Sequence, residues 1–103
     1  MDQNQVSQLK SAVSFFLRNN EPASAVRIAC QLPEPERTAQ LTTILLKQVE
    51  YGQLDDARKT ARLLGLELTV AQLTTILLKQ VKRGRLGAAR ETAQLLPEPQ
   101  AAA

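Results

Sequence analysis

Apolar residues recur at intervals of three and four along most of the chain, which is the spacing of helices that bury one face. The same set of apolar positions occurs twice, 32 residues apart, and each set is followed by a narrower stripe containing small residues. The first set is Leu41, Ile44, Leu45 and Val49; the second is Leu73, Ile76, Leu77 and Val81. The pattern predicts paired helices, a longer one and then a shorter one.

Residues that favour turns separate these stripes. Gly52 and Gly84 stand at one shared position, and Asn20 stands 32 residues before Gly52. Gly and Asn tolerate the left-handed backbone that commonly ends a helix. Pro22 suits a first helical turn, and Thr69 suits a helix N-cap. We expect six helices, at about 4–19, 22–32, 35–50, 54–64, 69–82 and 86–96.

The periodicity extends to the letters themselves. The eleven residues "AQLTTILLKQV" at 39–49 return unchanged at 71–81, and 19 of the 27 positions from 39–65 match 71–97. A more diverged copy, "VSQLKSAVSFFLRNNEPASAVRIACQLP", occupies 6–33. A fixed period of this size indicates a repeat array. The sequence therefore predicts one domain over 1–97, with units at about 3–33, 34–65 and 66–97 and a tail at 98–103.

Small residues at the middle of each shorter helix indicate how a unit packs. Ala57 and Ala89 permit the close end of the usual 8–10 Å between helix axes, so we expect both to be buried. A single helix pair has too little core, and stacked pairs share one. We predict an all-α fold in which three helix-turn-helix units form a solenoid.

The segments "GQLDDARKTARLLG" at 52–65 and "GRLGAARETAQLLP" at 84–97 carry a resemblance to the tetratricopeptide-like superfamily. Each has a Gly, a Leu two residues later, then Ala, and finally Leu before a helix-breaking residue. The resemblance spans 6–97 and implies a right-handed α-solenoid whose first helices line a concave groove.

Polar letters repeat together with the apolar ones, although core packing does not require Gln40, Thr42, Thr43, Lys47 and Gln48 to recur. Recent duplication explains this, and so does a surface that binds a partner in two adjacent registers. In the second interpretation the binding groove is lined by Thr42, Thr43, Lys47, Thr74, Thr75 and Lys79.

Composition excludes several kinds of chemistry. With no His and only Cys30, the chain can form neither a His-based catalytic triad nor an internal disulfide, and it offers a poor zinc ligand set. Cys30 and one of the adjacent residues Phe15 and Phe16 are expected in the core. The longest apolar run is three residues, and no signal peptide pattern opens the chain. We expect a cytoplasmic, non-enzymatic protein with no cofactor, no metal and no membrane segment.

Basic residues concentrate in the last unit. From 71 to 97 there are five basic residues and one acidic residue, whereas 39–65 holds four and three. The predicted basic patch is Lys82, Arg83, Arg85 and Arg90.

Two functions are consistent with these features. The first is a protein–protein interaction module, an adaptor or chaperone-like protein that holds a peptide or helix in the groove. The alternative is a nucleic-acid-associated protein that uses the basic patch. We also expect weak homodimers through the exposed ends of the solenoid, more through the N-terminal helix with Phe15 and Phe16 than through the C-terminal end.

Overall fold

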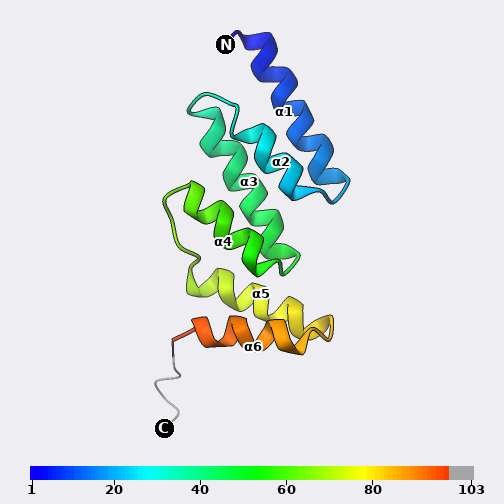
Figure 1. Ribbon diagram of the computed structural model, residues 1–103, viewed down its shortest axis with the longest axis vertical. Helices are drawn as coiled ribbons and strands as arrows, with labels where there is room; N and C mark the ends of the chain where they lie inside the picture. The colour runs from blue at the N-terminus through cyan, green and yellow to red at the C-terminus, as the bar shows by residue number, and fades with distance from the viewer. Residues whose placement is uncertain (98–103) are drawn as a thin grey trace.

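The computed structural model describes residues 1–97, and within that range the chain is all-helical, with six helices and no strand (Figure 1). The predicted tail at 98–103 lies outside the described residues. The helices are α1 (Gln3–Arg18), α2 (Pro22–Ala29), α3 (Glu36–Glu50), α4 (Leu54–Leu63), α5 (Val70–Lys82) and α6 (Leu86–Leu95).

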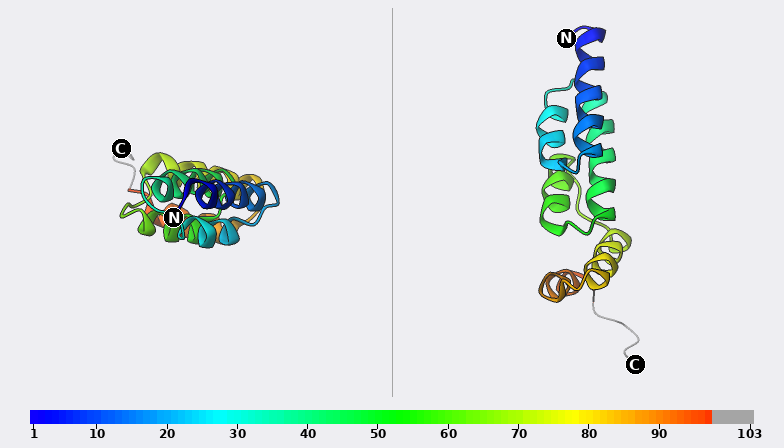
Figure 2. Two further views of the ribbon diagram at one scale, coloured as in Figure 1. Left: turned by 90° about the horizontal axis from the view of Figure 1, so that it is seen from above. Right: turned by 90° about the vertical axis from the view of Figure 1, so that its right-hand side faces the viewer.

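Consecutive helices pack as three pairs, α1 with α2, α3 with α4, and α5 with α6. The pairs follow one another along the long axis of an elongated molecule of 57 × 25 × 14 Å. Figure 2 shows α1, α3 and α5 on one side, and α2, α4 and α6 on the other. Helix α3 joins the pairs, because it also contacts α1, α2 and α5.

Local sequence signals place the turns and one helix start as predicted. Asn20, Gly52 and Gly84 adopt φ of 59°, 72° and 74°, the left-handed conformation expected after a first helix. Thr69 caps α5: its hydroxyl accepts from the Gln72 backbone N–H at 3.1 Å, and the Gln72 side chain accepts from the Thr69 N–H at 2.9 Å.

Helix α2 is shorter than predicted, ending at Ala29 rather than at residue 32. The Gln31 and Leu32 amides bond the carbonyls three residues back, a tighter turn than the α-helix, as the chain approaches Pro33. A residue before proline avoids helical backbone. The same effect ends α6 at Leu95, since Leu96 is extended (φ −79°, ψ 146°) before Pro97.

Acceptors outside α3 fix its start. Pro35, at the N-cap, makes no side-chain hydrogen bond, but the Glu34 carboxylate accepts from the Thr38 backbone N–H at 2.9 Å and from its hydroxyl at 2.8 Å. These hydrogen bonds favour the charged carboxylate and lower the pKa of Glu34, and nearby Arg37 adds to the effect.

The buried apolar residues form two clusters, one at each junction between pairs. The cluster between the first and second pairs contains Val13, Ala25, Ala29, Leu41 and Ile44. The cluster between the second and third pairs contains Leu45, Val49, Leu54, Ala57, Ala61, Leu73 and Ile76. The expected burial of Ala57 and Ala89 is confirmed.

The expectation for Cys30 is wrong, because its side chain is exposed. Helix α2 ends one residue earlier, so Cys30 leaves the buried stripe of Ala25 and Ala29. The expectation for the phenylalanines is confirmed: Phe16 packs against the first cluster and Phe15 is 52% exposed. Their rings meet edge to face, with centroids 5.5 Å apart.

Candidate interaction surface

The four predicted threonines lie exposed on α3 and α5. Each hydroxyl donates to a carbonyl of its own helix four residues back: Thr42 to Thr38 at 2.8 Å, Thr43 to Ala39 at 3.2 Å, Thr74 to Val70 at 2.8 Å and Thr75 to Ala71 at 3.0 Å. With these hydroxyl protons engaged, the threonines offer a partner their methyl groups and oxygen lone pairs. This surface is more apolar than the letters indicate.

Two leucines that the sequence analysis did not single out lie on the same two helices. Leu46 is 54% exposed and Leu78 is 63% exposed, and each is the last residue of an "ILL" run. A helix turns about 100° per residue, so three successive apolar residues cannot all face the core. That geometry was the available signal. We call the set Thr42, Thr43, Leu46, Lys47, Thr74, Thr75 and Leu78 the first-helix face.

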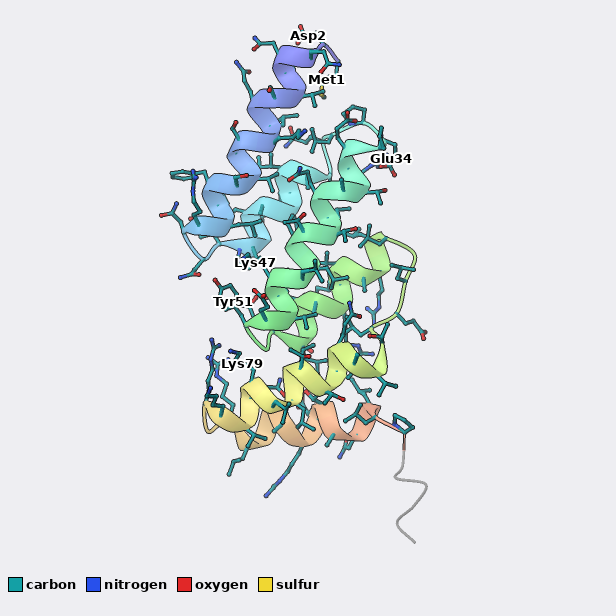
Figure 3. The ribbon with its side chains drawn as sticks, turned by 180° about the vertical axis from the view of Figure 1, so that it is seen from behind. Met1, Asp2, Glu34, Lys47, Tyr51 and Lys79 are labelled. Carbon is teal, nitrogen blue, oxygen red and sulfur yellow. The ribbon has the colours of Figure 1, made fainter. Side chains whose placement is uncertain are left out.

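The two predicted lysines occupy different environments. Lys47 is exposed and pairs with Glu50 at 3.7 Å. Lys79 is half-buried, and a Cβ atom placed on Gly52 would lie 3.1 Å from Lys79 Cβ. The Lys79 stem therefore packs on the turn after α3, a contact that only glycine at position 52 allows. Figure 3 shows Lys47, Tyr51 and Lys79 along one edge of the molecule.

A repeated polar residue proves to be structural, which corrects the expectation that packing does not require Gln48 to recur. Gln48 is 1% exposed and its counterpart Gln80 is 3% exposed. Gln80 Nε2 donates to the Gly52 carbonyl at 3.3 Å, and Thr92 Oγ1 donates to Gln80 Oε1 at 2.6 Å. Gln80 thus connects the turn of the second pair to α6.

Replacing Thr92 by Val tests this network. Thr92→Val keeps the side-chain shape but leaves Gln80 Oε1 buried without a donor, so we expect a loss of about 1 kcal/mol in the free energy of unfolding. Thr60→Val is the matched control. Thr60 stands 32 residues earlier and donates to the Asp56 carbonyl, while Gln48 Oε1 has no partner within residues 1–97. Chemical denaturation should show the smaller loss for Thr60→Val; equal losses would contradict the network.

The predicted basic residues are all exposed, but two of them contact or approach the second helix pair. Arg83 Nη1 donates to the Tyr51 carbonyl at 2.8 Å. Arg85 lines a hollow of about 330 Å³ together with Asp55 and Asp56. Lys82 ends α5 and Arg90 lies on α6. The set therefore divides between an inter-pair contact and the free surface of the third pair.

A second hollow of about 310 Å³ lies between α4, the loop after it and the ends of α5 and α6. None of the six predicted binding residues lines either hollow. Residues 1–97 contain no group of three His, Cys, Asp or Glu side chains able to hold a metal ion. Within the same range, every helix is too short or too polar to cross a membrane.

Comparisons with protein-family models, with curated proteins and with solved structures found no match. The argument for function therefore depends on the exposed surfaces of this chain.

Proposed function

We propose that the chain is a right-handed α-solenoid of three helix-turn-helix units and acts as a non-enzymatic protein-interaction module, an adaptor or chaperone-like protein of the cytoplasm. Its partner is a peptide or helix bound on the first-helix face. The two-sided arrangement of the helix pairs supports this architecture, and the 32-residue period of the sequence supports the assignment of units.

The observation that carries the proposal is the pair of exposed leucines. Leu46 and Leu78 recur at the same position of α3 and α5, more than half exposed, where neither serves the core. Threonine methyl groups flank both leucines one turn earlier, at Thr42 and Thr74. Two similar apolar stations on successive first helices suit a partner that repeats its own apolar contacts.

A pair of matched variants tests the face. In Leu46→Glu/Leu78→Glu, two charges enter the proposed site, whereas Leu63→Glu/Leu95→Glu places the same charges on α4 and α6 with the same 32-residue spacing. Leu63 and Leu95 are 54% and 41% exposed, so both double variants should fold. Each bait is used for affinity capture from the native host with identification by mass spectrometry.

We expect a partner that wild type and the α4/α6 control capture equally, and that the first-helix variant loses by at least about tenfold. Circular dichroism and thermal melting of each bait show that the fold is intact. If the first-helix variant retains every partner of wild type, the face has no binding role and duplication alone explains its recurrence.

A nucleic-acid partner is the second and weaker proposal. Lys82, Arg85 and Arg90 give the third pair an exposed positive surface, but Arg83 is engaged with Tyr51. Tyr51, the last aromatic residue of the chain, is itself half-buried rather than free to stack on a base. Binding to phosphates should weaken by orders of magnitude between about 50 and 200 mM salt, whereas binding on the first-helix face should change little.

A further inference from the structure

The surface of the third pair that faces away from the second pair carries exposed apolar side chains. Val81 is 50% exposed where its counterpart Val49 is 6% exposed, and Leu86 is 60% exposed where Leu54 is 7% exposed. Two further positions change in the same direction. We call Leu77, Val81, Leu86 and Ala93 the C-terminal face; their buried counterparts are Leu45, Val49, Leu54 and Ala61.

The chain itself shows what covers such a face. On the second pair the cover is helix α5, whose Leu73 and Ile76 complete the buried cluster. Polar contacts add to this packing: Gln80 donates to the carbonyl of Gly52, and Arg83 donates to the carbonyl of Tyr51. The surface complementary to this kind of face is therefore one side of an amphipathic helix.

The third pair repeats the backbone that receives those contacts. Gly84 has φ of 74° and Gly52 has φ of 72°, so the two turns share one conformation. Gly84 is exposed, whereas Gly52 is buried under Lys79. A helix on the C-terminal face can thus approach the Gly84 turn as closely as α5 approaches the Gly52 turn.

The charge around the face is reversed between the two pairs. The turn and following helix of the second pair carry Glu50, Asp55 and Asp56. At the corresponding positions the third pair has Lys82, Gly87 and Ala88, and it adds Arg83 and Arg85. Arg85 already lies beside Asp55 and Asp56 around one hollow, so opposite charges meet at the internal junction. The exposed copy of the junction presents three basic residues and no acidic one at these positions.

We propose that the C-terminal face binds an acidic amphipathic helix of a partner protein. Two aliphatic residues three positions apart take the places that Leu73 and Ile76 occupy at the internal junction. Acidic residues six and ten positions after the first aliphatic residue take the places of Lys79 and Arg83, and there they meet Lys82, Arg83 and Arg85. The C-terminal face is separate from the first-helix face, so the two proposals succeed or fail independently.

A second copy of the chain fits this face less well. Its α1 would offer Leu9 and Ala12 as the aliphatic pair, with Phe15 and Asn19 at the positions where acidic residues are needed. Arg18 would lie beside the basic residues of the other molecule. End-to-end stacking therefore combines a smaller apolar contact with unfavourable charge.

Peptides with the sequence of residues 69–83 are direct probes, since this segment already covers the homologous face. A hydrocarbon staple between positions 74 and 78, both exposed in α5, offsets the low helicity of a short peptide. One peptide has the native sequence and the other carries Lys79→Glu and Arg83→Glu. At about 50 mM salt we expect the acidic peptide to bind the full chain about tenfold more tightly than the native peptide, from two to three new charge pairs.

Two variants of the chain locate the site. Val81→Ser/Leu86→Ser should weaken binding of the acidic peptide by about tenfold or more, because both side chains are covered only in the complex. Leu66→Ser/Val70→Ser is the control, because these residues are 58% and 55% exposed and lie outside the C-terminal face. Charge reversal by Lys82→Glu/Arg85→Glu should exchange the preference, so that the native peptide becomes the tighter ligand.

The proposal is overturned if the native peptide binds wild type as tightly as the acidic one, or if Val81→Ser/Leu86→Ser leaves the affinity unchanged. Analytical ultracentrifugation across a hundredfold range of concentration gives a further decision. Self-association that Val81→Ser/Leu86→Ser abolishes and the control retains would show that a second copy occupies the face, and would also overturn the proposal. A monomer at every concentration supports a separate partner.

Discussion

Replacing Ile76 by Ala is expected to lower the free energy of unfolding by about 2–5 kcal/mol. Ile76 is fully buried, and it reaches from α5 into the cluster that α3 and α4 supply. Truncation removes apolar contacts and leaves a cavity at the junction of the second and third pairs. A domain of this size is stable by only about 5–15 kcal/mol, so the loss should be plain in urea denaturation.

Leu78→Ala is the matched control, two residues further along the same helix and 63% exposed. We expect a change within about 0.5 kcal/mol for this variant. Ile44→Ala, at the junction of the first and second pairs, should resemble Ile76→Ala, because Ile44 is buried to the same extent. A small effect of Ile76→Ala with a large effect of Ile44→Ala would mean that the third pair contributes little to the stability of the whole.

Enlarging Ala57 to Leu should cost about 1–3 kcal/mol, through overpacking rather than through a cavity. Ala57 is fully buried on α4, in the cluster that α3 and α5 also form. A larger side chain there must displace its neighbours. Ala39→Leu is the control, since Ala39 is exposed on α3. Thermal melting should show a lower midpoint for Ala57→Leu alone; equal midpoints would contradict close packing at position 57.

Features set by neighbouring residues were predictable from the sequence. The left-handed turn at Gly52 and the cap at Thr69 depend on the few residues around them, and both are present. Helix α2 ended early because the influence of Pro33 reaches back further than a periodicity argument allows. The general rule that residues before proline leave the helix was available, but the point at which α2 ends was not.

Features set by distant residues were not predictable. The burial of Gln80 depends on the Gly52 carbonyl and on Thr92, 28 positions before it and 12 after it. The half-burial of Lys79 likewise depends on how α5 lies over the turn of the preceding pair. As letters, Gln80 and Lys79 are surface residues, and only the packing of one pair on the next separates them from Thr74 and Thr75.

Leu64 packs against both buried clusters, although it is itself only partly buried. The first and third pairs each pack mainly on the second pair, so strain or order passes between the ends of the molecule through its middle. Amide hydrogen exchange should accordingly be slowest in α3 and faster towards either end. A ligand that orders the third pair would slow exchange strongly in α5, less in α3 and least in α1, so the chain would transmit binding as a gradient along its length.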